Sequence, residues 1–177
     1  MQAYHNVQLS YLEDMLFENL PLEKAKNWHE LFLNSITVVA DLPLVVSKFI
    51  VRILGDSERG CIIHAGTPDS EVAIKSVINL HERKIAGEKV SAEEWELARR
   101  AAYDAAVVDF SPDAAYVAVH AAYAASHAAA HAASHAAAYA TAAAAAYFTD
   151  DVAADAARAI HYEWMVDVLI KELKNAN

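Results

Sequence analysis

The chain has 177 residues, a formal net charge of -10, and 56% hydrophobic residues against only 9% aromatic residues, so alanine must supply much of the apolar content. This length fits one domain, and an acidic chain is a poor match for sequence-independent nucleic-acid binding, which needs dense Lys and Arg. Four glycines and four prolines exclude collagen-like and Pro/Gly-rich disordered chains, and a single cysteine excludes an internal disulfide framework.

In the N-terminal part of the chain, apolar residues recur at the spacing of a helix. Four leucines three or four residues apart predict a first helix that stops before Pro21: Leu9, Leu12, Leu16 and Leu20. A second helix is expected over 22–37, with a buried side made of Trp28, Leu31, Phe32 and Ser35. A third is expected over 43–54, with Gly55 after its last turn, where glycine commonly ends a helix.

The middle of the chain carries clear start and stop signals. Thr67 followed by proline predicts a helix start, because a threonine hydroxyl can accept a hydrogen bond from a free backbone N–H there. We expect this helix to end at Gly87. Ser91 and Glu94 then form the S-x-x-E pattern of a capping box, which predicts another helix up to about residue 108.

The alanine-rich stretch that follows is the dominant feature. Residues 114–148 hold no Gly, no Pro and no charge. Since alanine has the highest helix propensity, we expect one helix of about 33 residues, about 50 Å long. A last helix should begin at 149–151, with a buried side of Ile160, Trp164, Val168 and Leu169. The sequence thus predicts an all-α fold: a helical bundle of about six to seven helices around a long central alanine-rich helix.

We expect one helical domain over 1–177, with N-terminal helices and a loop in 1–65 and an alanine- and histidine-rich core in 66–177. The first ten residues lack the basic and apolar segments of a secretory signal peptide. The most apolar stretch, 31–54, is interrupted by charges, whereas a bilayer span needs roughly 20 mostly apolar residues. A cytoplasmic protein with no membrane and no nucleic-acid partner is therefore expected.

The larger side chains of the alanine-rich stretch are ordered. At about 100° per residue, six of them fall within a sector of about 80°: Tyr116, His120, Tyr123, His127, His131 and Ser134. We call this set the Tyr/His stripe. Two interpretations fit it: large side chains that fill the gaps between alanines, or a polar groove that binds a metal or a small ligand.

The metal hypothesis rests on helical geometry. Residues four apart lie about 6 Å apart on one helix face, so two imidazoles can share one ion such as Zn. His127, His131 and His135 have this spacing. Further ligands would have to come from other helices, and the candidates are His64, His81, Asp104, Glu163 and His161. No H-E-x-x-H or E-x-x-H occurs, so neither the zincin nor the di-iron pattern is present.

Cys61 and His64 have a C-x-x-H spacing in a loop flanked by glycines. This pattern fits a semi-buried structural thiol, and it also fits a Cys–His nucleophile pair. The motifs G-x-S-x-G, G-x-G-x-x-G and the phosphate-binding G-x-x-x-x-G-K are absent. No other catalytic signature is visible.

Several segments between about residues 70 and 146 carry a family resemblance: Ala73-Ile74, Ala86-Gly87-Glu88, Ala98-Arg99-Arg100-Ala101-Ala102 and the tract H-A-A-Y-A-A-S-H-A-A-A-H at 120–131. Together they resemble the Imm-5-like immunity-protein family of bacteria, and similar tracts occur in phage proteins. The family has a tryptophan where this chain has Leu80-His81. The resemblance implies a helical binding protein that neutralises a partner.

The sequence is compatible with two functions. The first is a small, acidic, homo-oligomeric binding protein of immunity type, whose negative faces attract a basic protein partner such as a nuclease toxin. The alternative is a metal- or small-ligand-dependent enzyme that uses the Tyr/His stripe, since imidazole titrates near neutral pH.

Overall fold

The computed structural model describes residues 7–37, 40–108, 114–126, 133, 136–137, 140–141, 143 and 151–176. Within these residues it contains seven α-helices, one short 3-10 helix and no strand, which confirms the predicted all-α bundle. The helices are α1 (Val7–Asn19), α2 (Leu22–Ser35), α3 (Leu42–Gly55), η2 (Cys61–His64, the 3-10 helix), α4 (Pro68–Ile85), α5 (Ala92–Val108), α6 (Ala114–Ser126) and α8 (Asp151–Lys174).

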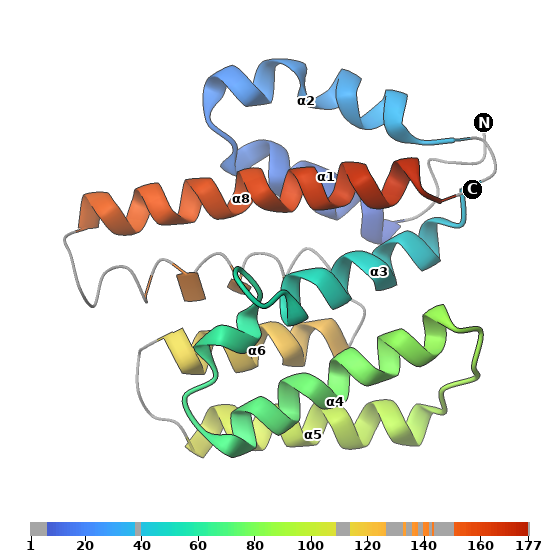
Figure 1. Cartoon of the computed structure of the whole chain (residues 1–177), viewed down its shortest axis with the longest axis vertical. Helices are drawn as coiled ribbons and strands as arrows, with labels where there is room; N and C mark the ends of the chain where they lie inside the picture. Colours follow the sequence, from blue (N-terminus) through green and yellow to red (C-terminus); the bar gives the residue numbers. More distant parts are fainter. Residues whose placement is uncertain are drawn as a thin grey trace.

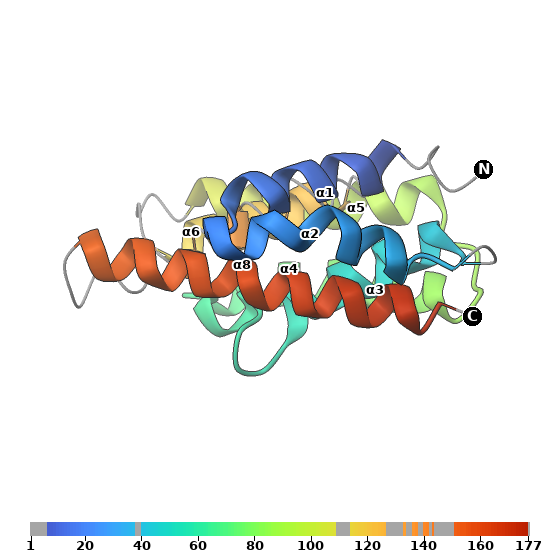
Figure 2. The ribbon, with the colours of Figure 1, turned by 90° about the horizontal axis from the view of Figure 1, so that it is seen from above.

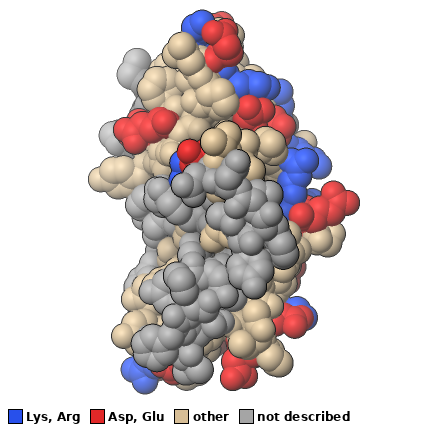
Figure 3. Space-filling model, turned by 90° about the vertical axis from the view of Figure 1, so that its left-hand side faces the viewer, with Lys and Arg blue, Asp and Glu red and all other residues tan. Residues whose placement is uncertain are grey.

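The helices form two groups that share α3 (Figure 1). One group contains α1, α2 and α8, which pack against one another, and the other contains α4, α5 and α6. Helix α3 contacts α4 on one side and α8 on the other, so it joins the two groups. Seen from above, α1, α2 and α8 run roughly along the same direction (Figure 2). On the face drawn in Figure 3, basic and acidic side chains lie close to one another along the right-hand margin.

Trp28 connects α2 to α1. Its side chain is 1% exposed, and its indole Nε1 donates a hydrogen bond to the carbonyl of Glu13, 3.3 Å away. The ring also lies 5.5 Å from that of Phe32, one turn further along α2. One side chain therefore combines a large buried apolar area with a satisfied polar atom, as buried tryptophans usually do.

The contact between α5 and α6 is built from alanine on both sides. Among the residues whose burial is described, the buried apolar ones are Ala98, Ala102, Ala105 and Ala106 of α5, and Ala118, Ala121, Ala122 and Ala125 of α6. Alanine buries little area, but its small side chain lets two helices approach closely. Larger side chains must then fill the space on another side of the alanine-rich helix. Helix α4 supplies them, since it also contacts α6 and buries Ile74, Val77 and Leu80.

The predicted start and stop of α4 are both confirmed. At its start, the Thr67 hydroxyl accepts a hydrogen bond from the backbone N–H of Ser70 at 3.1 Å. At its end, Gly87 has φ 81°, a left-handed conformation in which glycine has no Cβ penalty. Its N–H donates to the carbonyl of Lys84, and that of Glu88 donates to the carbonyl of Arg83. This pair of bonds is the Schellman ending of a helix.

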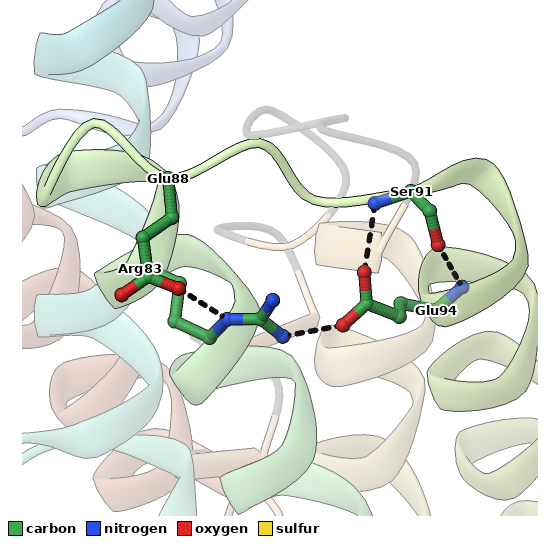
Figure 4. A network of polar contacts seen from close by, with 4 residues as sticks. All are labelled: Arg83, Glu88, Ser91 and Glu94. Atoms are coloured by element: carbon green, nitrogen blue, oxygen red, sulfur yellow. Dashed lines mark hydrogen bonds and ion pairs between the residues drawn. The ribbon is translucent and has the colours of Figure 1, made fainter.

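The capping box at the start of α5 is also confirmed (Figure 4). The N–H of Ser91 donates to the Glu94 carboxylate at 2.8 Å, and the N–H of Glu94 donates to the Ser91 hydroxyl at 3.2 Å. Arg83 of α4 binds the same carboxylate at 2.6 Å and Glu88 at 2.9 Å. The backbone hydrogen bond from Ser91, followed by the bond from Arg83, lowers the pKa of Glu94 to about 2. These contacts fix the turn between α4 and α5.

Replacing Ser91 with alanine should lower the free energy of unfolding by about 1 kcal/mol, because the free N–H at the start of α5 loses its acceptor. Chemical denaturation monitored by circular dichroism measures this change. Ser76→Ala is the matched control, because the Ser76 hydroxyl only binds the carbonyl of Val72 within α4. It should leave stability unchanged or raise it slightly. Equal losses for both variants would show that the capping box contributes nothing.

Two details of the predicted buried faces are wrong. Leu31 of α2 is 43% exposed and Ile160 of α8 is 60% exposed. Leu169 is buried as predicted, and the buried face of α8 also includes Tyr162, Met165 and Leu173. Ile160 precedes Leu169 by nine residues, which at about 100° per residue places it on the opposite side of the helix.

The first part of the predicted alanine-rich helix is α6, from Ala114 to Ser126. Beyond it, up to residue 148, the structure describes only residues 133, 136–137, 140–141 and 143, and all of them are helical. Whether the helix continues unbroken to residue 148 lies outside the described residues. Of the helices in the described part, none is both long and apolar enough to cross a bilayer.

Candidate functional site

His120 and Tyr123 are the members of the Tyr/His stripe whose side chains are described. Both are half-buried, and their rings lie 6.5 Å apart in an edge-to-face arrangement. Tyr123 also lies 6.1 Å from the ring of Tyr103 on α5. Burial lowers the pKa of His120. This part of the stripe therefore packs ring against ring beside the contact between α5 and α6.

The rest of the stripe lies outside the described residues: the side chain of Tyr116, and His127, His131, Ser134 and His135. In the part of the chain that the structure describes, no three His, Cys, Asp or Glu side chains gather as metal ligands. A metal such as Zn at His127, His131 and His135 stays a prediction.

The candidate ligands from other helices do not gather at one place in the described part of the chain, although His64 and His161 lie close enough for their charges to interact. Asp104 is exposed on α5, and Glu163 of α8 lies 3.9 Å from Lys24 of α2. His81 and His161 are 0% and 4% exposed. His81 belongs to the group of α4, α5 and α6, whereas His161 lies on α8, in the other group.

His81 connects three helices. It lies on α4, and its Nε2 donates to the carbonyl of Ala125 on α6 at 3.1 Å, since a carbonyl can only accept. Its ring and that of Trp95 on α5 pack in a T-shaped arrangement, with centroids 4.9 Å apart. Burial lowers the pKa of His81 to about 4, so the neutral ring is the stable form at neutral pH. In that form Nδ1 carries a lone pair, and it is buried without a hydrogen-bond partner among the described residues.

His161 is the second fully enclosed histidine. Its Nδ1 lies 3.1 Å from the hydroxyl of Thr141, and its ring lies 4.9 Å from Trp164. Burial, followed by the positive charges of His64 and Arg59, lowers the pKa of His161 to about 4. Both His81 and His161 thus hold helices together as neutral rings.

Cys61 and His64 do not form a nucleophile pair in the described structure. Cys61 is 1% exposed, and burial raises the pKa of its thiol to about 12. A nucleophilic cysteine needs the thiolate, which requires a lowered pKa. Burial also lowers the pKa of His64, which makes its charged form less available to stabilise a thiolate. The structure therefore supports the interpretation of Cys61 as a structural thiol.

An apolar groove runs between α4 and α5, formed by two hollows that share Val72 and Ala101. One hollow, of about 360 Å³, is lined by Thr67, Asp69, Val72, Ala73, Ala101, Asp104 and Ala105. The other, of about 600 Å³, is lined by Val72, Lys75, Ser76, Asn79, Leu80, Glu94, Leu97, Ala98 and Ala101. We call the two together the α4–α5 groove. Its apolar margins stay open to solvent, since Val72 is 61% exposed and Leu97 is 67% exposed.

Some charged residues of the α4–α5 groove form ion pairs, and others do not. Lys75 is paired with Glu71, and Glu94 is paired with Arg83. Asp69 and Asp104 are both exposed in the first hollow, and neither has an ion-pair partner among the described residues. The groove therefore combines an apolar floor with one unneutralised acidic end.

The α4–α5 groove could not be predicted from the sequence, because it depends on two helices lying side by side. The sequence does contain one indication of the groove. Val72 and Leu97 are apolar, yet they lie outside the faces that the buried residues of α4 and α5 define. Exposed apolar residues are common on protein surfaces, so neither one alone indicates a site.

The comparisons with known proteins add no relative: no family model, no curated protein and no solved structure matches this chain.

Proposed function

We propose that this chain is a non-enzymatic binding protein of immunity type, and that it holds a protein partner in the α4–α5 groove. The partner segment is an amphipathic helix that carries basic residues at one end. The observation that carries the proposal is the pairing of an exposed apolar groove with the unneutralised carboxylates of Asp69 and Asp104.

The shape of the groove favours a helix as the bound element. A helix that lies in a groove buries side chains spaced three and four residues apart. The floor of the α4–α5 groove is made of small residues, Ala73, Ala98, Ala101 and Ala105, so the side chains of a partner can approach the helix backbones. The exposed side chains of Val72 and Leu97 would become buried on binding, and each would add hydrophobic free energy.

The charge of the chain favours a basic partner. The net charge of -10 attracts cationic proteins over long distances, and Asp69 and Asp104 supply local negative charge at one end of the groove. This supports the partner class that the resemblance to immunity proteins implies. That the protein is a homo-oligomer stays a prediction, which light scattering can test on the same samples.

A fluorescently labelled amphipathic peptide of leucine and lysine, which forms a cationic helix, is a suitable probe. The wild-type chain should bind it with an anisotropy change that weakens as salt is raised, because salt screens the charges. Replacing Val72 and Leu97 together with serine should weaken binding at least about tenfold, which corresponds to about 1.4 kcal/mol. Asp69→Asn combined with Asp104→Asn should reduce mainly the salt dependence.

The matched control replaces two other exposed apolar residues with serine, Leu22 and Val152, which are 73% and 76% exposed and lie on α2 and α8. This variant should bind the peptide as the wild type does. If it loses as much affinity as the groove variant, or if the wild type does not bind the peptide, the proposal is wrong.

A further inference from the structure

A second cavity lies on the other side of α5, and the charged residues of its lining are basic. It has a volume of about 520 Å³ and is lined by His81, Lys84, Val90, Ala92, Trp95, Arg99 and Ser126. These residues come from α4, α5, α6 and the turn between α4 and α5. On α5, residues 92, 95 and 99 point away from residues 94, 97 and 101, which line the α4–α5 groove. The two sites are therefore distinct.

The lining of this cavity contains two cations and no carboxylate, in a chain whose net charge is -10. Lys84 has no ion-pair partner among the described residues. Arg99 uses its Nη1 to bind Glu96, but its Nε is buried and has no hydrogen-bond partner in the described structure. A buried donor of a charged group that makes no hydrogen bond is costly, so this position favours an anionic acceptor.

His81 adds an acceptor to the same lining. Because its Nε2 proton is held by the carbonyl of Ala125, its buried Nδ1 offers a lone pair, and that atom has no partner among the described residues. An anion without a proton would be repelled by this lone pair. An anion that carries an O–H group can donate to Nδ1 while its charged oxygens meet Lys84 and Arg99.

The rim of the cavity is held in place before any ligand binds. Val90 and Ala92 flank Ser91, whose capping box is tied to α4 through Glu94 and Arg83 (Figure 4). The ring of Trp95 is held against His81. A site with fixed side chains loses less conformational entropy on binding.

From this geometry we propose that the cavity binds a protonated phosphate group, either as inorganic phosphate or on a small molecule. Arg99 Nε and the Lys84 ammonium donate to its charged oxygens, and its O–H donates to His81 Nδ1. The indole of Trp95 and the side chains of Val90 and Ala92 provide an apolar wall for the organic part of a phosphate ester.

Isothermal titration calorimetry at neutral pH with inorganic phosphate tests the proposal, with sulfate as the comparison, because sulfate has the same shape but carries no proton. One phosphate should bind per chain, and sulfate should bind at least about tenfold more weakly. Glycerol phosphate distinguishes the two sources when both ligands are titrated at about pH 6, where a phosphate ester keeps its proton in part: tighter binding than inorganic phosphate indicates an ester as the ligand, and weaker binding indicates free phosphate.

Arg99→Gln should lower the affinity for phosphate at least about tenfold. Arg100→Gln is the matched control, since Arg100 binds the same Glu96 but does not line the cavity, and it should bind phosphate as the wild type does. Lys84 is exposed, so Lys84→Gln should not disturb folding, and it should also lower the affinity for phosphate. It replaces Arg99→Gln in the test if the change at Arg99 disturbs folding. The proposal is overturned if sulfate binds as well as phosphate, or if wild type and Arg99→Gln bind phosphate equally.

Discussion

Replacing Trp28 with alanine should lower the free energy of unfolding by about 3–5 kcal/mol, the usual range for deleting a large buried aromatic side chain. Trp28 is 1% exposed, and its loss would leave a cavity between α1 and α2. For a chain of this length the melting temperature should fall by about 6–20 °C. Differential scanning calorimetry, or denaturation followed by circular dichroism, measures the change.

Two further variants separate the causes of this loss. Trp28→Phe keeps most of the ring but removes the hydrogen bond from Nε1 to the carbonyl of Glu13, so it should cost less than the alanine variant. Leu22→Ala changes an exposed residue of the same helix and should change stability by less than about 0.5 kcal/mol. A loss below about 1 kcal/mol for Trp28→Ala would contradict the packing of α2 on α1.

Acid should weaken the fold through its two enclosed histidines. Burial lowers the pKa of His81 and of His161 from 6.5 to about 4, because a buried imidazolium loses its hydration. Between these values the unfolded chain binds more protons than the folded protein, so the free energy of unfolding falls as the pH falls from 6.5 towards about 4. Above 6.5 both states hold neutral rings, and this dependence disappears.

Each of the two histidines should account for a loss of roughly 3 kcal/mol by the lower end of this pH window, since one pKa unit corresponds to about 1.4 kcal/mol. Urea denaturation at a series of pH values measures it in the wild type and in His81→Gln and His161→Gln. Carboxylates titrate in all three proteins, so the difference between the curves isolates the histidines. Variants that lose stability in parallel with the wild type would refute this origin of the acid sensitivity.

The helix limits could be read from the sequence wherever one residue type decides the local backbone. Thr67, Gly87 and the pair Ser91–Glu94 are such positions, and the structure confirms each of them. Their signals act within a few residues, so they do not depend on how the helices pack. The all-α fold follows from the same local preferences.

Features that depend on distant contacts could not be predicted. The hydrogen bond between His81 and Ala125 joins residues 44 positions apart, and no local pattern indicates which carbonyl a histidine will meet. The exposure of Ile160 depends on which side of α8 faces α1, α2 and α3. Both cavities beside α5 arise from the spacing between helices. Of the predicted stripe, only His120 and Tyr123 have described side chains.

Because Cys61 is buried, the reactivity of its thiol reports how often the folded protein opens around it. It is the only cysteine, it is 1% exposed, and its thiol has a pKa of about 12, so the folded protein offers almost no thiolate to an alkylating reagent. Modification can then proceed only through conformations in which η2 has left its place against α3, α4 and α6. The alkylation rate, compared with that of a free thiol, therefore measures the free energy of this opening at a single position without any engineered label.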